Sequence, residues 1–145
     1  MRRVIVACLL SPLLVACVLP ARSFAAYAGK AAATADAVVS AARTAMLAAD
    51  VASRGRLLAP NASITLQETE EDASSARDNF LSIQPPDAAS DALRTRLDAL
   101  LEPVTRALSA LRIAARRGEL DRLPSLARPL RRLSARLERI ADRYA

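Results

Sequence analysis

The chain has 145 residues, a net charge of +6 and no histidine. The lack of histidine excludes Ser-His-Asp and Cys-His nucleophile sites, histidine-containing zinc sites and haem attachment through C-x-x-C-H. The three glycines are isolated, which excludes a glycine-rich phosphate loop. We therefore expect a protein that is not an enzyme and that holds no metal and no cofactor.

The first 16 residues have the form of an export signal. Arg2 and Arg3 precede an apolar run, Val4–Ala16, that would extend roughly 20 Å as a helix. A bilayer core is about 30 Å thick, and Pro12 interrupts the run, so this segment is too short to span a membrane. Its length is typical of the apolar region of a signal peptide.

The signal ends in a lipobox-like sequence, Leu14-Val15-Ala16-Cys17. It predicts cleavage before Cys17 and a diacylglyceryl group, with fatty acids such as palmitate, on the Cys17 sulfur. Two or more acyl chains form a stable anchor, which places the protein on the extracytoplasmic face of the cell membrane. The alternative is ordinary signal-peptidase cleavage at an A-x-A-like site further on, at Phe24-Ala25-Ala26 or Ala26-Tyr27-Ala28.

Residues 17–30 predict a lipidated cysteine followed by a flexible tether, because Pro20, Ser23 and Gly29 lie among small residues. Such a tether would reach up to about 40 Å. The domain itself is expected over residues 31–145. It is rich in Ala and Leu and has no Trp, a composition that favours helices.

The first two predicted helices are Ala31–Arg56 and Ser63–Ile83. The first is rich in alanine and has a wide apolar arc, so we expect it to be well covered or closely packed. In the second, apolar positions alternate at spacings of three and four, as in a bundle helix. Asn61 and Ser63 are its candidate caps.

The third and fourth predicted helices are Asp87–Arg117 and Asp121–Tyr144. Both carry leucine stripes at helical spacing, and Gly118 follows the third helix where a C-terminal glycine is expected. Pro103 and Pro129 lie inside these segments and predict kinks. Four amphipathic segments with short links predict an all-α, antiparallel, up-down four-helix bundle.

The last segment carries a basic stripe, which we name the arginine ridge. Its members fall at helical spacing opposite the leucines, with Arg131 beside them: Arg128, Arg132, Arg136, Arg139 and Arg143. The ridge predicts either contact with an anionic group or a solvated face partly paired with Glu138 and Asp142. The acids Glu68, Glu70, Glu71 and Asp72 are interpreted as a solvated face rather than a calcium site.

The chain resembles uncharacterised helical-bundle lipoproteins of actinobacteria in its lipobox, in Ile83-Gln84-Pro85-Pro86-Asp87 and in residues 111–118. The resemblance implies a location and a fold, and no activity. We expect a membrane-anchored, non-enzymatic interaction or structural module of the cell envelope, whose partner is anionic lipid, wall polymer or an acidic protein. Nucleic acid is not expected, because no aromatic residues interleave the arginines. The alternative is a carrier of a small ligand or ion, with a pocket between helices opened at Pro103 and Pro129.

Overall fold

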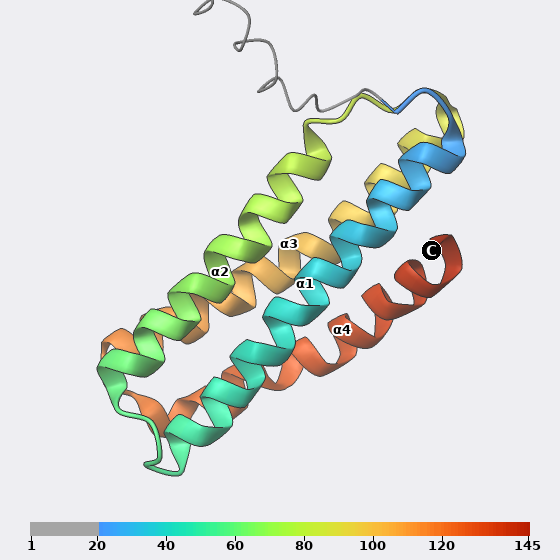
Figure 1. Ribbon diagram of the computed structural model, residues 1–145. Coiled ribbons are helices and arrows are strands. Elements are labelled where there is room, and N and C mark those ends of the chain that lie inside the picture. Colours follow the sequence, from blue (N-terminus) through green and yellow to red (C-terminus); the bar gives the residue numbers. More distant parts are fainter. Residues whose placement is uncertain (1–20) are drawn as a thin grey trace, which may run out of the picture.

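The structure is a computed structural model that describes residues 21–145, and over this range the chain is all-α (Figure 1). Its helices are α1 (Phe24–Ser53), α2 (Ala59–Leu81), α3 (Ala88–Arg116) and α4 (Leu123–Tyr144), and a short 3-10 turn, η1 (Leu120–Arg122), precedes α4.

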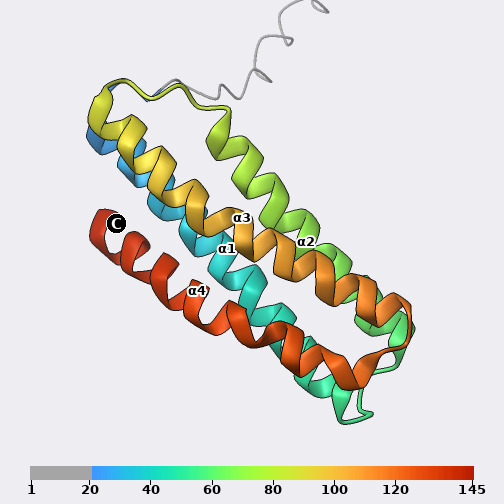
Figure 2. The ribbon, with the colours of Figure 1, turned by 180° about the vertical axis from the view of Figure 1, so that it is seen from behind.

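Successive helices run antiparallel, so the chain passes up and down the bundle (Figure 1). Each helix packs against its neighbours in sequence, α1 packs against α4 to close the ring, and α1 also packs against α3. Figures 1 and 2 show α2 and α4 on opposite sides of this α1–α3 pair. The predicted antiparallel four-helix bundle is confirmed.

The helical domain begins earlier than the sequence indicated. Ser23 caps α1, its hydroxyl accepting a hydrogen bond from the Ala26 amide at 3.3 Å. Tyr27 in the first turn is fully buried, and its ring lies 5.2 Å from that of Phe80. A flexible tether extending to residue 30 is therefore wrong from Phe24 onward, because burial of aromatic side chains fixes this segment against α2.

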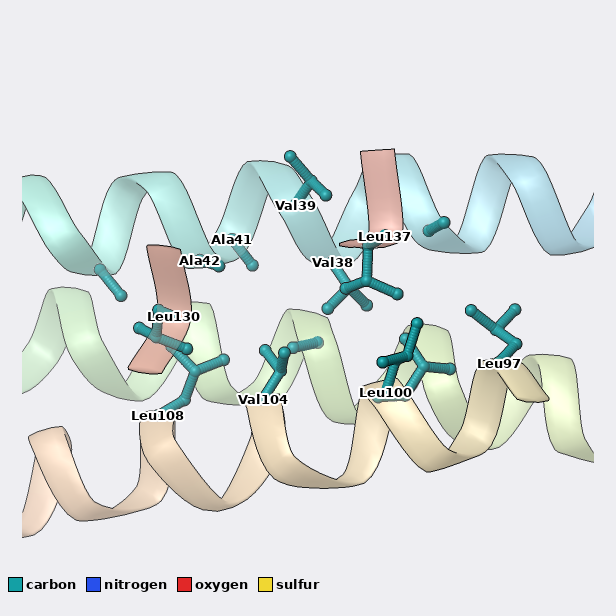
Figure 3. Close-up of a cluster of buried hydrophobic side chains, with 14 of the residues drawn as sticks. Val38, Val39, Ala41, Ala42, Leu97, Leu100, Val104, Leu108, Leu130 and Leu137 are labelled. Atoms are coloured by element: carbon teal, nitrogen blue, oxygen red, sulfur yellow. The ribbon is translucent and has the colours of Figure 1, made fainter. Parts of the chain in front are cut away.

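Helix α1 is the packing centre of the bundle. Ten of its thirteen buried residues are alanines, which permit the backbones of its neighbours to approach closely. Larger side chains from the other helices fill the space around it, and Figure 3 shows Leu100, Leu108 and Leu137 among them in the buried cluster. The wide apolar arc of the sequence thus reflects contact with three helices rather than one.

The start of α2 differs from the prediction. The helix begins at Ala59, four residues before Ser63, and its N-cap Leu58 makes no side-chain capping bond. Pro60 lies in the first turn, where its missing N–H would have had no helical partner and its fixed φ suits the helix. Asn61 and Ser63 therefore lie inside α2, and their predicted role as caps is wrong.

Two glycines end helices in the left-handed region. Gly118, with φ of 73°, donates its N–H to the Ala115 carbonyl, and Glu119 donates to the Ala114 carbonyl. After α1, Gly55, with φ of 70°, donates its N–H to the Ala52 carbonyl, and Arg56 donates to the Val51 carbonyl. These pairs form Schellman motifs, which satisfy the last carbonyls of a helix and need a residue without a Cβ.

The N-terminus of α3 is defined by a capping bond. The Asp87 carboxylate accepts a hydrogen bond from the Ser90 amide at 2.8 Å. This bond favours the charged carboxylate, so it lowers the pKa of Asp87 below the ordinary 3.8. The predicted boundary at the Pro85-Pro86-Asp87 link is confirmed.

Helices α3 and α4 continue through Pro103 and Pro129. A proline leaves the carbonyl four residues earlier without its helical donor. The carbonyls concerned belong to Ala99 and Ser125, and both residues are exposed. Water can therefore donate a hydrogen bond to each carbonyl in place of the missing amide.

The apolar stripes of all four helices meet in one cluster within residues 21–145. The predicted stripe of α3 is buried along its length, from Leu93 to Ala115. The described residues therefore share one hydrophobic core. None of the helices described here is long and apolar enough to cross a membrane.

Candidate functional site

The leucine seam of α4 places the arginine ridge on the outer side of the bundle. Leu123, Leu130 and Leu137 are fully buried, and the positions facing away from them carry the arginines. The five predicted ridge residues are all exposed: Arg128, Arg132, Arg136, Arg139 and Arg143. Arg131 beside them is exposed too. The geometry of the ridge is therefore as the sequence indicated.

Ridge arginines make no ion pair with any acidic side chain in residues 21–145. The acid expected to pair with them, Glu138, instead accepts a hydrogen bond from Arg43 of α1 at 2.8 Å. Asp142 makes no ion pair within the described range either. The predicted pairing of the ridge with Glu138 and Asp142 is wrong, because Glu138 lies on the side of α4 that faces α1.

Part of the ridge borders a surface groove between α3 and α4, which we name the arginine groove. Leu100 and Ile140 contribute apolar surface to it, and its volume is about 530 Å³. Arginines come from both helices: Arg96 from α3, and Arg136, Arg139 and Arg143 from α4. Asp142 is the one acid along its border.

Arg143 links the groove to the start of the domain. Its guanidinium lies 5.6 Å from the centroid of the Tyr144 ring, within the range of a cation–π contact. The Tyr144 ring meets that of Phe24 edge-on at 6.1 Å. The groove therefore lies towards the end of the bundle at which α1 begins, as Figure 1 shows for the C-terminus of α4.

Other ridge residues lie apart from the groove. Arg128 and Arg131 line a smaller hollow of about 240 Å³ between α1 and α4, together with Met46 and Asp50. Arg132 is exposed and lines neither of these two hollows. The ridge is thus one continuous stripe along α4, but its arginines lie in separate places: some border the arginine groove and others border the smaller hollow towards α1.

Arg96 was not among the predicted site residues. It stands alone on the exposed side of α3, without the regular spacing that made the ridge visible. Only the packing of α3 against α4 brings it to the same groove as Arg136. The local sequence of α3 or of α4 alone does not show that Arg96 lies beside the arginines of the other helix.

Charge is divided between the two outer helices. Five acids and one arginine give α2 a net charge of −4, whereas six arginines and two acids give α4 a net charge of +4. Because these helices lie on opposite sides of the α1–α3 pair (Figures 1 and 2), the domain has one acidic and one basic side.

Ion pairs at the α2–α3 seam show where opposite charges do meet. Arg77 of α2 bonds Asp98 of α3 at 2.7 Å, and Arg112 of α3 bonds Glu70 of α2 through two nitrogens. These hydrogen bonds raise the pKa of both arginines above their ordinary value. The pairs help to fix α2 beside α3.

The acids of α2 diverge around the helix rather than converging. Glu70 bonds Arg112 at the α3 seam, and Glu71 accepts a hydrogen bond from Gln67. Glu68 and Asp72 line a separate groove towards α1. In the described part of the chain no three His, Cys, Asp or Glu side chains are placed to hold a metal ion.

The lipobox, Leu14 to Cys17, lies outside the described residues. Comparisons of the chain with protein-family models, with curated proteins and with solved structures find no match. The lipid attachment and the resemblance to actinobacterial lipoproteins therefore remain predictions from the sequence.

Proposed function

We propose that the chain is an exported lipoprotein, anchored through Cys17, whose helical bundle is a non-enzymatic interaction module of the cell envelope. Its contact surface is the arginine groove, and its partner presents an anionic group there. The observation that carries this proposal is the gathering of four arginines around one groove that has a single acid, Asp142, on its border: Arg96, Arg136, Arg139 and Arg143. None of the four forms an ion pair in the described residues.

The early start of α1 supports cleavage before Cys17. Cleavage after Ala26 or Ala28, the two ordinary signal-peptidase sites, would remove Phe24 from its contact with Tyr144. Cleavage after Ala28 would also remove Tyr27 from the core. Cleavage before Cys17 keeps the capping Ser23 and the whole of α1 in the mature protein.

Unpaired guanidinium groups support an anionic partner. Each guanidinium is a planar fork of N–H donors that matches carboxylate or phosphate oxygens, and it remains charged at any physiological pH. Four of them along one groove repel one another, so a bound anion relieves that repulsion as well as forming hydrogen bonds. A surface kept only for solubility does not require arginines from two helices to share a groove.

The carrier alternative has less support. It expected a pocket opened between helices at Pro103 and Pro129, yet neither proline lines the hollows described above. The core positions beside them, Val104 and Leu130, are fully buried in the packed cluster. The arginine groove is open to solvent and does not enclose a ligand.

The anchor and the groove are tested separately in cells that produce the protein. Replacing Cys17 with Ser should release the protein from the membrane fraction, because the acyl chains can no longer be attached. The variant Arg136→Gln/Arg139→Gln should remain in the membrane fraction but lose cross-linking to its envelope partner. Membrane retention of a Cys17→Ser variant whose signal is still removed normally, or unchanged cross-linking of the arginine variant, would contradict the corresponding half of the proposal.

A further inference from the structure

We infer that the arginine groove binds the phosphate-bearing headgroup of an anionic phospholipid in the membrane that holds the anchor, so that the bundle lies with its α3–α4 side against the bilayer. This inference rests on the proposed function for the anchor, and it names the groove's partner. It follows from the position of the groove, its lining and the distribution of charge.

The anchoring segment is short. Seven residue steps separate Cys17 from Phe24, the first residue of α1, and an extended chain of this length spans about 25 Å. Phe24 contacts Tyr144, whose neighbour Arg143 borders the groove. The groove is thus within reach of the membrane surface, whereas a tether extending to residue 30 would have left the domain free to stand away from it.

The lining of the groove matches a phospholipid better than a free anion. Arginines stand at its border and suit a phosphate, while Leu100 and Ile140 offer apolar surface that a free phosphate ion cannot cover. A headgroup with its glycerol carbons presents both kinds of surface at once.

Charge on the outer helices sets the orientation. An anionic membrane attracts α4, with its net charge of +4, and repels α2, with its net charge of −4. Since these helices lie on opposite sides of the domain, both forces turn the same side towards the bilayer. Helix α2 then faces away from the membrane.

The test uses residues 21–145, which contain the four helices and the buried cluster between them and lack the anchor. Binding is measured to phosphatidylcholine vesicles with and without about one third phosphatidylglycerol, at about 50 mM salt, where screening is weak. We expect binding to the anionic vesicles alone. Addition of inorganic phosphate at low millimolar concentration should not displace the domain, and displacement would assign the groove to a soluble phosphate instead.

Two matched comparisons separate a site from general attraction. Arg136→Gln/Arg139→Gln removes two groove residues of α4, and Arg128→Gln/Arg132→Gln removes the same charge from the same helix outside the groove. Each arginine near an anionic membrane strengthens binding about fivefold, so Arg136→Gln/Arg139→Gln should weaken binding about 25-fold. Arg128→Gln/Arg132→Gln should weaken it much less.

The second comparison uses α3. Arg96→Gln should weaken binding about fivefold, while Arg116→Gln, an exposed arginine at the far end of the same helix, should leave it nearly unchanged. None of these arginines has an ion pair in the described residues, so each variant should keep the wild-type melting temperature, which circular dichroism checks.

Equal losses for the groove and control variants would overturn the inference, and so would absence of binding to anionic vesicles. These outcomes leave the anchor untouched, because the tested domain does not contain Cys17. The mass of the mature N-terminus of the full-length protein, which includes a lipid on Cys17 only if the anchor forms, reports on the anchor alone, so the two proposals fail independently.

Discussion

Replacing Gly29 with Ala tests the finding that the bundle begins at Phe24. Gly29 lies inside α1, and a Cβ built on it meets no atom within 4 Å, so alanine adds no clash. Alanine is favoured over glycine in a helix interior by about 1 kcal/mol. For the 125 residues from 21 to 145, 1 kcal/mol corresponds to about 4 °C in melting temperature. Gly29→Ala should therefore raise the melting temperature by about 4 °C.

Thermal unfolding of residues 21–145 followed by circular dichroism provides the measurement. Gly118→Ala is the matched control, because its φ of 73° strains any residue with a Cβ, and this variant should melt lower by a similar amount through a loss of about 1 kcal/mol. The same substitution thus has opposite signs at two sites. An unchanged melting temperature for Gly29→Ala would refute the reasoning, since it would show that this segment is a tether and not part of the cooperative fold.

Three further predictions concern packing, capping and the α2–α3 seam. Ala45 is fully buried in α1, so Ala45→Leu should overpack the core and lower the free energy of unfolding by about 1 to 3 kcal/mol, measured by urea denaturation. Asp87→Ala should lower the melting temperature at pH 7. The capping bond lowers the pKa of Asp87 in the folded protein. The wild type therefore loses this stabilisation as the pH falls below about 3.8 and through the lower folded-state pKa. At such acidic pH the melting temperatures of the wild type and of Asp87→Ala should converge. A double-mutant cycle with Glu70→Gln and Arg112→Gln should give a coupling of about 1 kcal/mol, since both side chains are largely buried, at 20% and 21% exposed. A coupling near zero would contradict a structural role for this pair.

The regular parts of the fold could be read from the sequence because their signals are periodic. Leucine and valine stripes in the last two helices specify one buried face each, and all predicted positions of α3 are buried as expected. Gly118 and the Pro85-Pro86-Asp87 link marked the two ends of α3 correctly. Glycine adopts the left-handed conformation that ends a helix at little cost, and a proline keeps the residue before it out of the helical region.

The less regular parts required the tertiary structure. The first turns of α1 have the small residues typical of a linker, and only the contact of Tyr27 with Phe80 shows why they are helical. Pro60 lies in the first turn of α2, and the residue type alone does not distinguish this position from one that follows the end of a helix.

Part of the candidate site could also be predicted from a periodic pattern in the sequence. The arginine ridge was visible because its residues repeat at helical spacing on one segment. Its division into separate environments, and the inclusion of Arg96, depend on how α3 and α1 pack against α4. The partner of Glu138 was predicted wrongly because Arg43 lies 95 residues earlier in the chain.

The most direct test of a lipid-anchored protein is the mass of the N-terminal peptide from protein extracted from its native membrane. The lipoprotein proposal predicts that the mature chain begins at Cys17 and that this residue carries a diacylglyceryl group. An unmodified N-terminus following Ala26 or Ala28 would contradict it.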